Sequence, residues 1–235
     1  GNWRGMVMRT DTAPFDNPKV RKAVRLAVDR QELVDTVMGG EAVVSCDTPV
    51  APTDQYRHNM SCGQNIAEAK KLLKEAGYPN GIEMVIHVST KEPTWPTIAE
   101  VIQQQVAKAG IKVEIKMTPS KSYWKETWMK KDVAMTRWNE RSADSVLHEV
   151  YHSSAKWNES YYKSSDFDKN LSDARGELDF TKRKALYEKA QHTLWNQSGT
   201  MIPYHVSKLV VTNSRVKNLD EVEVFSIQWH KVKVD

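Results

Sequence analysis

Long apolar runs are absent from this sequence, and so is any concentration of one charge. No stretch approaches the roughly 20 apolar residues that a membrane-spanning helix needs, and no signal peptide opens the chain. The 34 basic residues nearly balance the 30 acidic ones, and they are spread along the chain instead of being massed in one block. These absences argue against a nucleic-acid partner. They favour a soluble globular protein, mature or truncated, with enough apolar residues for a substantial core.

The common motifs of enzyme active sites are also missing. The sequence has no Gly-rich phosphate loop, no G-x-S-x-G turn and no C-x-x-C metal pair. It also has no internal repeat and no low-complexity tract. We therefore expect no catalytic residue, no resident metal and no cofactor.

Cysteine is scarce, since only Cys46 and Cys62 occur, both in one polar, loop-rich segment. A free thiol has no packing reason to lie there, so the favoured interpretation is a disulfide, worth about 3 kcal/mol through its effect on the unfolded chain. Two unpaired buried thiols are the alternative. A disulfide would indicate an oxidising compartment.

Apolar periodicity and capping residues predict alternating helices and strands. After a strand over residues 3–10, Asn17 caps a helix that runs to about Asp29, with Pro18 at its first position. A short helix ending at Gly39, a loop and a helix ending before Gly77 follow. The loop is expected over 41–63, later helices over 145–152, 167–178 and 185–198, and strands over 200–212 and within 222–234.

Residues 82–138 give the clearest pattern, a strand–helix–strand–helix–strand series. The expected strands are 82–88, 111–117 and 133–138, and the expected helices are 94–109 and 120–130. Strands joined through helices run parallel, so their carboxyl ends meet at one edge of the sheet, where α/β folds bind ligands. The segments on that edge are 89–95, 118–124 and 138–144.

The best candidates for ligand contact follow the third of these strands. Trp138 can stack on a ligand, Asn139 can hydrogen-bond to it, and the Arg141 guanidinium can bind its carboxylate. The other two segments add Thr90, Trp95, Tyr123 and Trp124. As alternatives, the aromatic residues could be plain core, and Arg141 could form a surface ion pair with Asp144.

Four segments, taken together with their order and spacing, resemble segments of a known protein family. They are P-F-D-N-P-K-V-R-K-A-V-R-L-A-V-D-R-Q-E-L-V (14–34), A-K-K-L-L-K-E-A-G-Y-P-N-G (69–81), the Trp138 loop, and F-D-K-N-L-S-D-A-R-G-E-L-D-F-T-K-R-K-A-L-Y-E-K-A-Q (167–191). Together they resemble family 5 of the bacterial extracellular solute-binding proteins, the peptide, opine and nickel receptors of ABC importers.

The resemblance implies a periplasmic-binding-protein-like type II lobe, with a mixed, largely parallel sheet flanked by helices. Full-length members are much longer, so residues 1–204 would form the carboxyl-terminal lobe. The tail 205–235 would return to an amino-terminal lobe that is missing here. The implied partners are a small solute trapped between the lobes and an ABC permease, and the implied location is the periplasm or another extracytoplasmic site.

One position departs from the family's peptide receptors. In those receptors an Asp three residues after the loop Trp pairs with the peptide's amino terminus, whereas this chain has Arg141 there. A guanidinium favours the opposite ligand charge, because it pairs with carboxylate or phosphate. We therefore expect a carboxylate-bearing solute, which could be a peptide, an opine-like compound or another anion.

The segment H-E-V-Y-H, residues 148–152, offers a different function. Two histidines at i and i+4, with a Glu beside the first, form a zinc-peptidase motif. No third ligand follows at the required spacing, because Asn158 stands where a metzincin has its third His and Glu159 is too near. A zinc-dependent peptidase is thus the alternative to the receptor interpretation.

Overall fold

The computed structural model describes residues 1–207, 209, 211–219 and 229–234. Its main sheet has six strands in the order β2-β6-β1-β5-β3-β4. The strands are β1 (Trp3–Met8), β2 (Ala42–Val44), β3 (Ile82–Ser89), β4 (Ile111–Thr118), β5 (Val133–Trp138) and β6 (Thr200–Val206). The α-helices are α1 (Pro18–Leu26), α2 (Arg30–Met38), α3 (Ile66–Glu75), α4 (Trp95–Ala107), the one-turn α5 (Ser120–Ser122), α6 (Ala143–Tyr151), α7 (Ser165–Gly176) and α8 (Phe180–Gln197).

The sheet is mixed, and the directions of its strands bring the ends of several strands to one edge. β3 pairs in parallel with β4 and β5, as expected for strands joined through helices. β1 runs antiparallel to β5 and β6, and β2 runs antiparallel to β6. The predicted α/β class with a mixed sheet is confirmed, but "largely parallel" describes only its β5-β3-β4 part. The carboxyl ends of β3, β4, β5 and β6 therefore share an edge with the start of β1.

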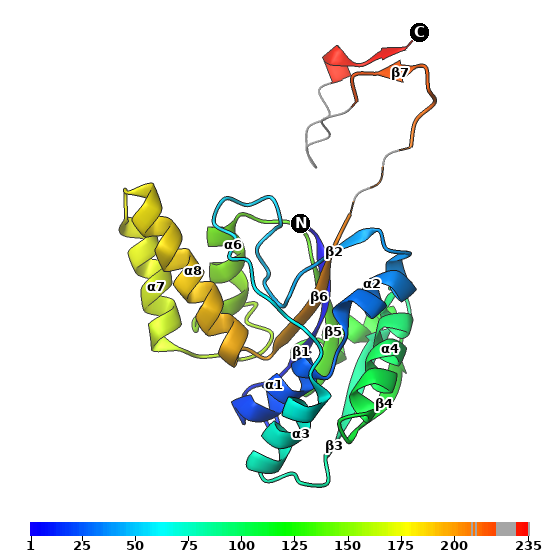
Figure 1. Ribbon diagram of the computed structural model, residues 1–235, viewed down its shortest axis with the longest axis vertical. Helices are drawn as coiled ribbons and strands as arrows, with labels where there is room; N and C mark the ends of the chain where they lie inside the picture. The colour runs from blue at the N-terminus through cyan, green and yellow to red at the C-terminus, as the bar shows by residue number, and fades with distance from the viewer. Residues whose placement is uncertain (208, 210, 220–228, 235) are drawn as a thin grey trace.

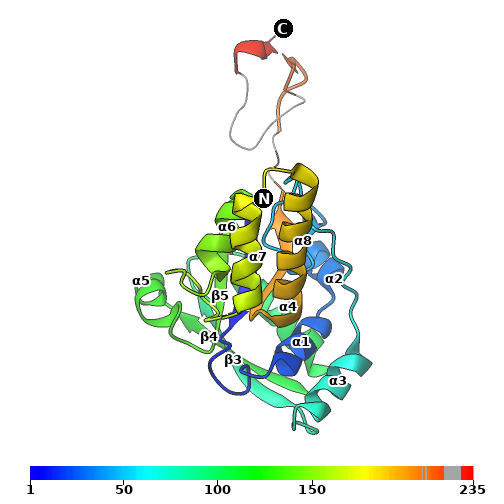
Figure 2. The ribbon, with the colours of Figure 1, turned by 90° about the vertical axis from the view of Figure 1, so that its left-hand side faces the viewer.

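Two hydrophobic clusters hold the helices against the sheet. The larger cluster joins residues of α1, α2, α3 and α4 to the strands, and the smaller one joins α6, α7 and α8. Figure 1 shows α6, α7 and α8 on one side of the strands and α2 and α4 on the other, and Figure 2 shows α7 and α8 side by side. The edge that carries the candidate site thus has a packed core on each side.

The helix boundaries follow from local capping. The Asn17 side chain accepts the backbone N–H of Lys19, and Pro18 occupies the first turn of α1. Asp29 accepts two N–H groups at the start of α2, which ends at Gly39 in the left-handed conformation with φ of 59°. The predicted cap at Asn17, Pro18 at the first position and the helix end at Gly39 are confirmed, whereas the first helix ends at Leu26, before the predicted Asp29.

The predicted helix over 120–130 is confirmed only in part, because the segment is helical from Ser120 to Thr127 but is not a regular α-helix. The one-turn α5 is followed by a π-helical turn, Tyr123–Thr127, in which the N–H of Trp128 bonds to the carbonyl of Tyr123. The Tyr123 hydroxyl donates to the carbonyl of Met135 in β5 at 2.5 Å. This buried bond ties the first residue of the widened turn to the sheet.

Other predicted boundaries also shift. The predicted loop 41–63 contains strand β2, and the strand predicted over 200–212 ends at Val206. His205 pairs with Trp3 inside the sheet, so the predicted lobe boundary at residue 204 falls within β6. Of the strands predicted within 222–234, residues 222–228 lie outside the described residues. β8 (Lys233–Val234) pairs with β7 (Val216–Lys217), and Figure 1 shows this pair standing apart from the main sheet.

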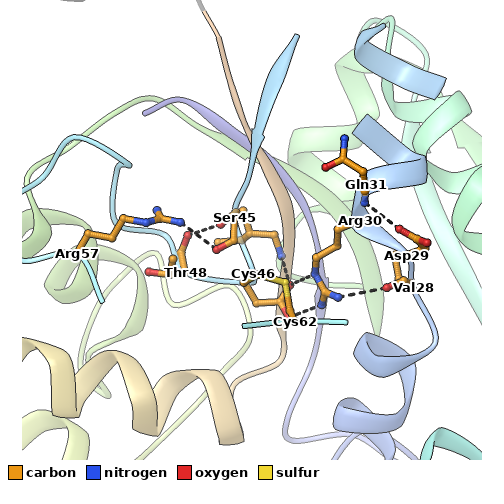
Figure 3. Close-up of a disulfide and its surroundings, with 11 residues drawn as sticks. Val28, Asp29, Arg30, Gln31, Ser45, Cys46, Thr48, Arg57 and Cys62 are labelled. Carbon is orange, nitrogen blue, oxygen red and sulfur yellow. Dashed lines mark hydrogen bonds and ion pairs between the residues drawn. A yellow bond between two sulfur atoms is a disulfide. The ribbon is translucent and has the colours of Figure 1, made fainter. Parts of the chain in front are cut away.

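The predicted disulfide joins Cys46 to Cys62, with their Cα atoms 5.3 Å apart (Figure 3). Beside it lies a buried ion pair, in which Arg30 contacts Asp47 at 2.5 Å and both side chains are at most 3% exposed. The alternative of unpaired thiols is excluded by the bond. Within the described residues, no helix is both long enough and apolar enough to cross a membrane.

Candidate functional site

Two rows of side chains end at the shared edge of the sheet. Cross-strand pairing of β5, β1 and β6 aligns them as Trp138–Trp3–His205 and Arg137–Arg4–Tyr204. Successive side chains of a strand point to opposite faces, so the two rows lie on opposite sides of the sheet. The tryptophan row lies on the side of α6, α7 and α8, because Trp138 packs against their cluster.

Trp138 forms a partly buried platform at the end of β5. Its ring centroid lies 5.8 Å from that of Trp157, and the guanidinium carbon of Arg141 lies 5.0 Å from its ring centroid. A cation this close to an indole is attracted by the ring's quadrupole. The predicted platform and the predicted cation are thus in contact with one another.

Arg141 forms an ion pair, but with a partner different from the one considered in the sequence. Its Nε lies 2.7 Å from the carboxylate of Glu149 in α6, and the other oxygen of that carboxylate accepts the hydroxyl of Ser145. Asp144 is bonded instead to Arg175 and to the hydroxyl of Tyr187. Among the described residues, the hydrogen bonds of the Arg141 guanidinium pass through Nε, which leaves its two Nη groups for a further acceptor.

Asn139 and Thr90 lie exposed on the same edge. The N–H of Thr90 donates to the carbonyl of Thr118 at 3.0 Å, which links the chain just after β3 to the end of β4. Both side chains are placed where a ligand at this edge could reach them. They remain candidates.

Trp95, Tyr123 and Trp124 form one aromatic cluster, but only one of the three reaches the surface. Trp95 and Tyr123 have no exposed surface, whereas Trp124 is 38% exposed. The Trp124 ring meets Tyr123 edge-on at 5.4 Å and Trp95 at 6.1 Å. Trp95 and Tyr123 are therefore no longer candidates for ligand contact. Their rings instead pack against Trp124 and support it from within the core.

The sequence predictions missed a second ionic group at this edge. Arg137 pairs with Glu92 at 2.8 Å, and its guanidinium carbon lies 5.9 Å from the ring centroid of Trp124. Arg4 lies opposite Arg137, and burial lowers its pKa while the charge of Glu92 opposes that shift. The alternation of side-chain direction along β5 was enough to predict that Arg137 lies at this edge, on the face opposite Trp138. The pairing that brings Arg4 beside it joins distant parts of the chain and leaves no local signal.

Comparison with known protein families identifies the family to which this chain belongs. The sequence model described as bacterial extracellular solute-binding proteins, family 5 middle, matches residues 1–158. The chain belongs to this family. The family 5 resemblance inferred from the four segments is confirmed.

Several relatives resemble this family 5 chain over most of its length. The glutathione-binding protein GsiB of Salmonella typhi is 32% identical over 225 residues, which cover 90% of this chain and 44% of that protein. The GsiB protein of Escherichia coli K12 is 31% identical over 226 residues, with the same coverage. The chain therefore spans less than half the length of the curated relatives it matches.

Solved structures agree with the fold. The periplasmic binding protein DppA from Helicobacter pylori, in complex with the peptide STSA, superposes with a TM-score of 0.78 at 26% identity, over 99% of this chain and 47% of that one. HbpA2 from Haemophilus parasuis gives a TM-score of 0.77 at 28% identity, over 87% of this chain and 42% of that one. The chain thus has a fold found in periplasmic binding proteins.

The H-E-V-Y-H segment of this family 5 chain does not assemble a metal site. The rings of His148 and His152 stack 5.7 Å apart, but Glu149 turns away to Arg141. No group of three potential metal ligands occurs within the part of the chain that the structure describes. Nothing in the site or in the named relatives favours the peptidase interpretation.

Glu159 is a functional candidate that the sequence did not reveal. This buried carboxylate accepts hydrogen bonds from the hydroxyl of Thr136, at 2.6 Å, and from the indole of Trp128. Burial raises the pKa of Glu159 to about 7, and these hydrogen bonds oppose the rise. Thr136 lies on the same face of β5 as Trp138, so Glu159 supports the strand behind the platform.

Proposed function

We propose that this chain is a ligand-binding lobe of an ABC-importer receptor and that its sheet edge binds a carboxylate-bearing, peptide-like solute. The observation that carries the proposal is the stacking of Arg141 on Trp138 at the carboxyl edge of β5. The indole offers an apolar face to the solute. The guanidinium, held at Nε by Glu149, offers its Nη groups to the solute's carboxylate.

The position of this edge supports binding between two lobes. β1 starts and β6 ends there, so the segments flanking the lobe leave the sheet on the same side (Figure 1). In a receptor of twice this length, a second lobe would face Trp138 and Arg141 across a cleft. The tail after β6 would cross to that lobe, and lobe closure would bury the solute and create the form that a permease recognises outside the cytoplasmic membrane.

The relatives support the class of solute. The two curated relatives are named for glutathione binding, and the DppA structure contains the peptide STSA. Glutathione and an unblocked peptide both carry carboxylates. Arg141 is suited to such a group, because a guanidinium binds a carboxylate through two parallel N–H groups.

Isothermal titration calorimetry on the full-length, two-lobe receptor tests this proposal. Glutathione and a panel of short peptides would be titrated into the wild type and into Arg141→Gln. We expect the substitution to weaken the best ligand about 10- to 100-fold, as for loss of a hydrogen bond to a charged group.

Arg9→Gln is the matched control. Arg9 also pairs with a carboxylate, Asp11 at 2.7 Å, and also lies over an aromatic ring, Tyr161 at 4.2 Å, but it follows the opposite end of β1. Its substitution should leave the affinity within about twofold. Equal affinities of wild type and Arg141→Gln would overturn the proposal.

A further inference from the structure

A small cavity lies apart from the sheet edge, between the end of α1, the start of α2 and the loop that carries Cys62. Its volume is about 90 Å³. The lining residues are Lys22, Arg25, Leu26, Arg30, Asp47, Ser61, Cys62, Gly63 and Trp195. None of the proposed solute contacts is among them. The space equals that of about three water molecules, which excludes a peptide but admits a small ion.

The charges around this cavity do not balance. Lys22, Arg25 and Arg30 contribute three positive charges, and Asp47 contributes one negative charge. Both carboxylate oxygens of Asp47 already have partners. One contacts Arg30 at 2.5 Å, and the other accepts the N–H of Ile202 at 3.0 Å. Figure 3 shows Arg30 beside the disulfide at this place. Two cations are therefore left without a neutralising carboxylate in the cavity wall.

Arg25 is the less satisfied of these two cations. Its side chain is buried, with 4% exposure, and its Nη2 reaches the carbonyl of Asn196 at 3.4 Å, a long hydrogen bond. Its Nη1 has no hydrogen-bond partner within the described residues. Burial lowers the pKa of Arg25, the charge of Arg30 adds to this effect, and only Asp47 opposes it. A buried guanidinium with an unused donor is unfavourable unless an acceptor is supplied.

The other lining groups suit an anion. Lys22 extends over the ring of Trp195, with its Nζ 5.5 Å from the ring centroid, and this cation–π contact favours an ammonium position at the cavity wall. Ser61 adds a hydroxyl donor. The loop that carries Ser61 is tied to Cys46 by the Cys46–Cys62 disulfide. The cavity thus combines several donors with a net positive charge, beside a loop that is closed by a disulfide.

We propose that this cavity binds a small inorganic oxyanion, phosphate or sulfate, at Lys22 and Arg25. A charge of −1 to −2 offsets the excess of +2, and an oxyanion has enough acceptor oxygens to meet both cations at once. The bound ion would contact two cations of α1 beside the Arg30–Asp47 ion pair, which joins α2 to the disulfide-bonded loop. This site is separate from the solute-binding edge and does not depend on the solute's identity.

Calorimetric titration of the 235-residue chain, dialysed free of both oxyanions, tests the site. Sodium phosphate and sodium sulfate are titrated at constant ionic strength, with sodium chloride and sodium acetate as comparisons. We expect one saturable oxyanion site with a dissociation constant of about 1 mM or tighter. Arg25→Gln should weaken it at least about 10-fold and Lys22→Gln about threefold.

Lys19→Gln is the matched control, because Lys19 lies on the same helix but pairs with Glu75 on the surface. It should bind the oxyanions like the wild type. Lys22→Gln keeps the test decisive if Arg25→Gln fails to fold, since Lys22 is only half-buried. The proposal is overturned by an absence of saturable binding, by wild-type affinity in Lys22→Gln, or by chloride or acetate binding as tightly as sulfate.

Discussion

Glu159 places an ionisable group where water cannot reach it, directly behind the strand that ends in Trp138. One carboxylate oxygen is held by Thr136 and Trp128. The other oxygen, and the indole N–H of Trp138, have no hydrogen-bond partner within the described residues. The strand that ends in Trp138 is therefore backed by a group whose charge is disfavoured, and the protonation of this group near neutral pH affects the stability of the fold.

The pKa of Glu159 predicts the direction of a pH effect. Folding raises this pKa from the ordinary 4.5 to about 7, so between these values the folded protein binds a proton that the unfolded chain has released. The free energy of unfolding should consequently fall as pH rises from about 4.5 to 7, by up to about 3 kcal/mol from this group. Glu159→Gln should remove this dependence, as measured by urea denaturation across that range.

Glu126→Gln is a suitable control for that series, because Glu126 is an exposed acid in the neighbouring π-helical turn. It should keep the wild-type pH dependence. A stability difference between wild type and Glu159→Gln that stays constant from pH 4.5 to 8 would show that the carboxyl group does not titrate as described.

At the scale of elements, local rules account for most helices and strands, and long-range contacts account for the exceptions. Asn17, Asp29 and Gly39 define their helix ends through bonds to near neighbours, which a sequence displays. The turn at Tyr123 is different, since its hydroxyl is tied to Met135, twelve residues on. β2 has only three residues and exists because β6 pairs with it. Neither the bond from Tyr123 to Met135 nor the pairing of β2 with β6 can be predicted from apolar periodicity.

The Cys46–Cys62 loop gives a prediction at this scale. The bridge spans 16 positions of sequence, so its removal should lower the free energy of unfolding by about 3 kcal/mol. The double variant Cys46→Ser/Cys62→Ser, measured by urea denaturation, should match the wild type under reducing conditions. A loss below about 1 kcal/mol would mean that the loop is ordered by its other bonds, such as that from Arg57 to the carbonyl of Ser45.

At the scale of the whole molecule, strand direction predicted which strand ends share an edge, but not which side chains are exposed at that edge. Parallel strands place the ends of β3, β4 and β5 on one edge, and that was readable from the sequence. Trp95 and Trp124 both follow such ends, yet one is buried and the other exposed. Arg4 reached the edge only through antiparallel pairing of β1 with β5. Side-chain burial and non-local pairing are properties of the packed molecule.

The central claim is that Arg141 recognises a carboxylate of the solute. The most direct test is a thermodynamic cycle in the full-length receptor, which combines Arg141→Gln with the carboxyl-terminal amide of the tightest-binding peptide of the panel. Calorimetry should give a coupling energy of about 1.5–3 kcal/mol between the guanidinium and the carboxylate. A coupling below about 0.5 kcal/mol, with the acid and the amide affected equally by the substitution, would contradict the claim.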